Sequence, residues 1–91
     1  MATIKEAVQN ATVFAQETLG VERTAGLQLE EVESANVGGE DAWLITLSMV
    51  NLLGRHVVTA LPLAPRDYKI FTVLKKSGEV TSMRIRELAA T

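Results

Sequence analysis

The chain of 91 residues contains no cysteine, so it can form neither a disulfide framework nor a thiolate metal site. A fold of this size must be stabilised by packing, and 47% hydrophobic residues supply enough apolar material for one modest core. We therefore expect a single domain over residues 1–91. The absence of cysteine is also typical of proteins from a reducing compartment.

Long hydrophobic runs are missing as well. No apolar stretch approaches the roughly 18–20 residues that a membrane-spanning helix needs. The first residues, MATIKEAVQNATVF, carry Lys5 and Glu6 where a secretory signal peptide has an apolar segment. We therefore expect a cytoplasmic protein that does not enter a membrane.

Residues that carry chemistry are scarce. His56 is the only histidine, and its neighbours Arg55 and Val57 offer neither a nucleophile nor a carboxylate. The acidic residues around Glu30 lack the twelve-residue spacing of a calcium loop, and Gly38-Gly39 lacks the Gly-Lys-Ser/Thr of a phosphate loop. We expect no catalytic residue, no metal site and no cofactor, and hence a protein that is not an enzyme.

Charge is unevenly distributed, although the net charge is only -2. Residues 1–41 contain two basic and eight acidic residues, whereas residues 66–87 contain six basic and three acidic ones. Such a chain can pair its own halves in the fold or attract an oppositely charged partner, and we favour the internal explanation. The net acidic charge and only 4% aromatic residues argue against nucleic acid as the partner. The basic residues that would have to form such a nucleic-acid surface are Lys69, Lys75, Lys76, Arg84 and Arg86.

A helix is predicted over about residues 3–19. Thr3 and Glu6 have the spacing of a capping box, and apolar residues then recur every three or four positions as far as Leu19. Gly20 is expected to end the helix in the left-handed conformation. Several residues of the apolar stripe are alanines, so this helix should lie close to the sheet that it covers.

Four strands are predicted over about residues 27–33, 42–50, 68–75 and 80–87. In the first of them, Val32 breaks the alternation set by Leu27 and Leu29. Either a bulge at Glu30–Glu31 returns Val32 to the inner face, or the strand simply ends at Glu31. In the second strand, alternation from Trp43 onward predicts an inner face on which the tryptophan anchors the core.

The last two strands should be joined by a turn at residues 75–78, in which Gly78 takes positive φ as a bulge. The predicted fold class is therefore α+β, with one N-terminal helix packed on a four-stranded antiparallel β-meander. Residues 51–66, NLLGRHVVTALPLAPR, are assigned to a loop or insertion because Pro62 cannot donate to a central ladder. This segment either turns back as a hairpin or covers a sheet edge or face, and its Leu61 and Leu63 are candidate interaction residues.

The third strand is apolar on both of its faces, a pattern that normally indicates burial on both sides. One helix can cover only one face, and at about 25 cal/mol per Å² the apolar side chains on the other would contribute several kcal/mol when covered. Either the 51–65 segment or a second molecule covers them, most simply in a homodimer formed by back-to-back sheets or by edge pairing. The predicted interaction residues on this face and at its margin are Leu44, Tyr68, Ile70, Leu74, Arg84 and Arg86.

The stretch YKIFTVLKKSGEVTSMRIRE, residues 68–87, places Tyr68, Phe71 and Val73 before a Ser77-Gly78-Glu79-Val80 turn. In this it resembles the C-terminal hairpin of PepSY-type domains and of small bacterial proteins similar to them. PepSY domains are associated with the restraint of peptidases and with other binding roles, usually outside the cytoplasm. The resemblance implies a non-catalytic module whose sheet face or edge engages another polypeptide. The chain differs from such domains in lacking an export signal and in carrying the 51–65 segment.

The leading hypothesis is a non-enzymatic accessory module that self-associates or binds a larger protein, for instance a peptidase that it regulates. The alternative is a small antitoxin- or immunity-type neutralising protein, whose acidic N-terminal half masks a basic toxin surface. A third hypothesis is a small enzyme or ligand carrier with its site at a dimer interface, where Tyr68, Arg84 or Arg86 would supply the polar groups.

Overall fold

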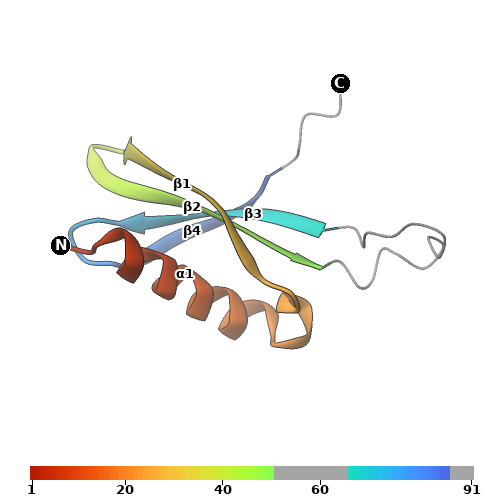
Figure 1. Cartoon of the computed structure of the whole chain (residues 1–91). Coiled ribbons are helices and arrows are strands. Elements are labelled where there is room, and N and C mark those ends of the chain that lie inside the picture. Colours follow the sequence, from red (N-terminus) through yellow and green to blue (C-terminus); the bar gives the residue numbers. More distant parts are fainter. Residues whose placement is uncertain (51–65, 87–91) are drawn as a thin grey trace, which may run out of the picture.

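The computed structural model describes residues 1–50 and 66–86, which form one α-helix, one short 3₁₀ turn and a four-stranded sheet (Figure 1). The order of elements is α1 (Ile4–Leu19), η1 (Glu22–Thr24), β1 (Gln28–Val37), β2 (Glu40–Val50), β3 (Arg66–Leu74) and β4 (Val80–Ile85). The sheet has the order β1-β2-β3-β4 and all its pairings are antiparallel. The predicted α+β fold of one helix on a four-stranded meander is confirmed.

The helix α1 begins at the predicted capping box. The Glu6 amide donates to Thr3 Oγ1 at 3.1 Å and the Thr3 amide donates to Glu6 Oε1 at 2.8 Å, so two otherwise unpaired backbone donors are satisfied. At the other end, Gly20 has φ +90° and ψ 154°. The helix therefore stops where predicted, at a glycine with positive φ, but this ψ lies outside the αL region and leads the chain into η1 along extended backbone.

The bulge predicted in β1 is present. The pairing with β2 shifts between Leu29 and Glu31, so that Glu30 has no partner in the ladder. Val32 then lies opposite Ile45 and packs against the core, as the bulge requires. The alternative, a strand that ends at Glu31, is wrong: β1 continues to Val37 and turns tightly through Gly38 and Gly39, which both have positive φ.

The core lies between α1 and one face of the sheet. Ala7, Ala11 and Ala15 of the helix are fully buried, four residues apart, against Ile45, Leu47, Met49, Phe71 and Val73 of the two central strands. A helix face made of alanines allows the helix to lie close to the sheet. The rings of Phe14 and Phe71 meet edge to face, with centroids 6.1 Å apart. Trp43 packs at the edge of the core, and its indole N–H donates to the carbonyl oxygen of Ala2 at 3.1 Å.

The β3–β4 connection matches its prediction, since Gly78 has φ +77° and donates to the Leu74 carbonyl at 2.8 Å. The strand bounds differ from the predicted ones at both ends of this hairpin. Arg66, assigned to the loop, already pairs with Val50 in β3, and β4 ends at Ile85. The remainder of the predicted loop, including His56, Pro62, Leu61 and Leu63, lies outside the described residues.

Candidate protein interaction site

The sheet has a second face, which points away from α1 and which we call the far face. Figure 1 shows the helix on one side of the sheet only, and no described helix or strand lies over the other side. Because opposed residues of antiparallel strands point to the same side, the register defines four rows across the far face between the terminal pairs Val37–Glu40 and Val50–Arg66. The rows are Ala35–Ala42–Leu74, Glu33–Leu44–Thr72–Ser82, Glu31–Thr46–Ile70–Arg84 and Gln28–Ser48–Tyr68.

All the predicted interaction residues within the described ranges come together on this face. Leu44, Tyr68, Ile70 and Leu74 are half-buried there, and Arg84 is exposed at the β4 margin. Arg86 directly follows β4, and its amide donates to the Tyr68 carbonyl at 2.8 Å. Leu61 and Leu63, the other two predicted residues, belong to the part of the chain that is not described.

Between the half-buried apolar groups of the far face lie three buried hydroxyl side chains. Thr46, Ser48 and Thr72 are at most 3% exposed. Each has a hydrogen-bond partner: Ser82 Oγ donates to Thr72 Oγ1 at 2.8 Å, Ser48 contacts Glu30 and Arg66, and Thr46 contacts Arg86. Buried hydroxyls without partners would destabilise the fold, so these contacts let polar groups occupy the middle of the sheet.

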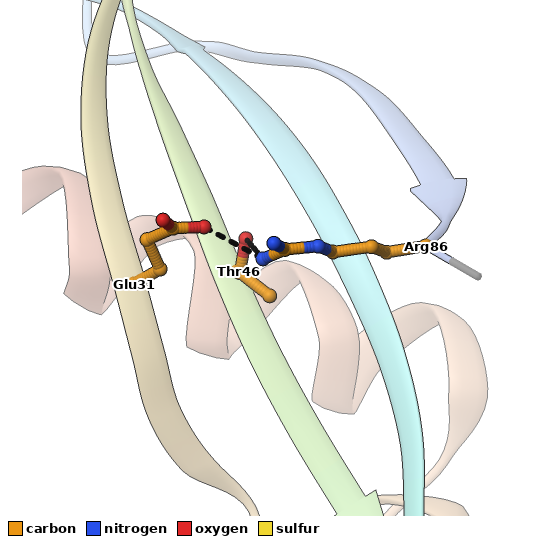
Figure 2. A network of polar contacts seen from close by, with 3 residues as sticks. All are labelled: Glu31, Thr46 and Arg86. Carbon is orange, nitrogen blue, oxygen red and sulfur yellow. Dashed lines mark hydrogen bonds and ion pairs between the residues drawn. The ribbon is translucent and has the colours of Figure 1, made fainter. Parts of the chain in front are cut away.

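Arg86 extends across the far face from β4 to β1 (Figure 2). Its Nη1 atom donates to Glu31 Oε1 at 2.6 Å and to Thr46 Oγ1 at 3.4 Å. The side chains of Arg86 and Glu31 are 37% and 52% exposed, so solvent screens the ion pair and it contributes about 0.2–1 kcal/mol. The pair joins the basic C-terminal part of the chain to its acidic N-terminal part, as the favoured explanation of the charge asymmetry predicted.

A second arginine organises the end of the far face near η1. Arg66 Nε donates to Ser48 Oγ at 2.9 Å, and its Nη2 atom donates to the carbonyl oxygen of Gly26. Ser48 in turn donates to Glu30 Oε2 at 2.6 Å, as does Gln28 Nε2 at 2.6 Å. The hydrogen bond from Gln28 and then that from Ser48 lower the pKa of the Glu30 carboxyl below its ordinary value. Desolvation opposes them in part, and the positive charge of Arg66 adds a lowering that is smaller still.

This lowered pKa predicts a pH-dependent contribution to stability. A carboxyl whose pKa is lower in the folded state stabilises the fold above its unfolded pKa of 4.5, and the contribution is lost as the pH falls through the lowered folded value. We therefore expect the wild type and a Glu30→Gln variant to differ most in unfolding free energy above pH 4.5 and to converge below it. Urea unfolding over this range measures the difference, with Glu17→Gln on the exposed side of α1 as the control. A gap that stays constant with pH would contradict the prediction.

The basic residues do not form one surface. Arg84 lies on the far face, whereas Lys69, opposite Leu47, belongs to the face that carries α1. Lys75 places its Nζ atom 4.1 Å from the centre of the Trp43 ring and donates to Ser34 Oγ at 2.6 Å. Arg84 and Lys69 thus lie on opposite sides of the sheet, so the basic residues considered as a nucleic-acid surface are divided between its two faces.

Comparisons with known proteins add no relative: no family model, no curated protein and no solved structure matches this chain. The resemblance to PepSY-type domains stays a prediction. Within residues 1–50 and 66–86, no three His, Asp or Glu side chains are placed to share a metal ion. None of the helices in these two ranges has the length and hydrophobicity required to cross a membrane.

Proposed function

We propose that this protein is a non-enzymatic interaction module that binds a polypeptide through the far face of its sheet. The observation that supports this function is the composition of that face. Leu44, Tyr68, Ile70 and Leu74 are only half-buried there, with no described element over them. On the opposite face, by contrast, α1 buries the central residues Ile45, Leu47, Met49, Phe71 and Val73. Apolar surface of this kind favours association because covering it gains about 25 cal/mol per Å².

The polar part of the far face is compatible with being covered. Arg86 is paired with Glu31 and Thr46, and Arg66 is paired with Ser48, so a partner would not bury these charges alone. The same contacts reduce the support for an antitoxin-type role, since two of the three clustered acids, Glu30 and Glu31, are engaged within the molecule. A self-associating module or one that binds a larger protein, such as a regulated peptidase, fits the face better than a neutraliser of a basic toxin does.

Site-specific photo-crosslinking tests the proposal. A benzophenone amino acid in place of Leu44 should form crosslinks to another polypeptide in cells, with mass spectrometry identifying the product. Crosslinks in the purified protein as well would indicate self-association. The matched control carries the same group in place of Val13, which is 50% exposed on α1, and should give no such product. Equal yields from both positions would overturn the proposed function. So would crosslinks from position 44 that reach only residues of the same chain, because the face would then be covered internally.

A further inference from the structure

The far face has a regular pattern of side-chain size. In each of the four rows, β2 and β3 place one small residue beside one large one: Ala42 beside Leu74, Thr72 beside Leu44, Thr46 beside Ile70, and Ser48 beside Tyr68. The row of Thr46 and Ile70 lies at the middle of the β2–β3 ladder, which runs from Ala42–Leu74 to Val50–Arg66. The small members are at most 3% exposed, so the half-buried large ones supply the accessible apolar surface of these rows. Such a surface packs best against one that places small side chains opposite its large ones.

Charge on the far face changes sign from one edge of the sheet to the other, from negative at β1 to positive at β4. The β1 margin carries the carboxylates Glu31 and Glu33, and the β4 margin carries the guanidinium of Arg84. Among the described residues, neither Glu33 nor Arg84 makes a side-chain hydrogen bond or an ion pair, and both are exposed. A partner that matches this face must therefore present positive charge over β1 and negative charge over β4.

We infer that the partner is a second copy of this chain, packed face to face about a two-fold axis that runs parallel to the strands between β2 and β3. This inference rests on the proposed function and names the polypeptide that is bound. Such an axis keeps each row opposite the same row of the second copy but reverses its order. Strand β2 then lies over β3 of the other copy, and β1 lies over β4, at the spacing of about 10 Å typical of packed sheets.

This arrangement satisfies both patterns at once. Leu74 lies over Ala42 of the second copy, and Ile70 lies over Thr46, so in each of the four rows the large side chain of the central strands lies over a small one. At both margins Arg84 of one copy comes within reach of Glu33 of the other, which stands in the adjacent row. The dimer thus has two identical ion pairs between copies, one on each side of the axis.

The other two-fold axis that packs two far faces together runs across the strands, and it conflicts with the same patterns of charge and side-chain size. A two-fold axis across the strands would place β1 over β1 and β4 over β4, so that carboxylates face carboxylates and arginines face arginines. With that axis through the Thr46–Ile70 row, Ile70 would also lie over Ile70 of the second copy, which brings two large side chains together. Repulsion between like charges and the steric conflict both select the axis parallel to the strands.

Charge reversal at the two exposed positions tests this geometry. Wild-type chain should sediment as a dimer, and Arg84→Glu or Glu33→Arg alone should weaken the dimer about tenfold, because each places like charges together at two sites. An equimolar mixture of the two variants should regain near wild-type affinity as a heterodimer, since Glu then faces Arg at both sites. Lys76→Glu and Glu17→Arg make the same charge changes at exposed positions outside the far face, and should affect neither the single chains nor their mixture.

The outcomes separate this inference from the proposed function. A dimer that is weakened by both reversals but not restored by mixing would overturn the two-fold arrangement. Pairing of two β1 edges would leave the dimer insensitive to Arg84→Glu, and pairing of two β4 edges would leave it insensitive to Glu33→Arg. Either result would also overturn the two-fold arrangement. A wild-type chain that stays monomeric while position 44 crosslinks to a different identified protein would refute the second copy and still support the interaction module.

Discussion

A Phe71→Ala variant is expected to lose a large part of the unfolding free energy of this protein and to unfold at a much lower urea concentration. Phe71 is fully buried at the centre of the core and contacts the Phe14 ring edge to face. Removing a buried phenylalanine side chain costs about 3–5 kcal/mol, because the apolar burial is lost and a cavity remains. A domain of this length has a total stability of only about 5–14 kcal/mol, and small cores lie at the lower end of that range.

Urea unfolding followed by the fluorescence of Trp43, the only tryptophan, measures this effect. The matched control is Ile85→Ala, because Ile85 lies on the same sheet face but is 73% exposed at the end of β4. The control should change the unfolding free energy by no more than about 0.5 kcal/mol. Similar midpoints for the two variants would mean that the helix does not bury this face of β3.

The second large effect is expected from overpacking the helix. Ala11→Leu should destabilise the protein by about 1–3 kcal/mol, because the position is fully buried where α1 lies against the sheet and has no room for three further carbon atoms. To accept the leucine, α1 must move away from the sheet. That shift would disturb the hydrogen bond from the Trp43 indole to the Ala2 carbonyl, so the tryptophan emission of the folded state should change as well.

Val13→Leu provides the comparison on the same helix. Val13 is 50% exposed, so its replacement by leucine adds bulk to α1 without entering the contact with the sheet. We expect the unfolding midpoint and the Trp43 emission of this variant to match those of the wild type. If Ala11→Leu is tolerated equally well, the alanines do not set the distance between helix and sheet.

Much of the fold could be predicted because its determinants are local. The capping box of Thr3 and Glu6 spans one helical turn, and the bulge in β1 follows from the displacement of Val32 by one position. The same locality explains the errors. For Gly20 the local pattern predicts the αL conformation, which is the commonest helix ending, whereas its observed ψ is extended. For Arg66 the local pattern predicts a loop, because the strand alternation begins clearly only at Tyr68. Residues 34–37 lack apolar alternation, yet they extend β1 because they pair with β2 across a two-residue turn.

The candidate site was predictable in part for a related reason. Alternation along β2 and β3 placed Leu44, Tyr68, Ile70 and Leu74 on one face before any pairing was known. The arginine contacts were not predictable in this way. Arg86 and Glu31 are 55 residues apart in the sequence, and neither residue type indicates its partner. Their contact depends on how far β4 runs and on the bulge that positions Glu31.

By itself, the amino-acid sequence determined the elements of this protein and which side chains share a strand face, because turns and alternation act over a few residues. Only the tertiary structure decided which residues lie opposite one another, and hence the rows of large and small side chains, the buried hydroxyls and the arginine that crosses the sheet. The physical reason is that register couples strands distant in sequence. A shift of one residue would exchange the two faces while leaving every local pattern unchanged.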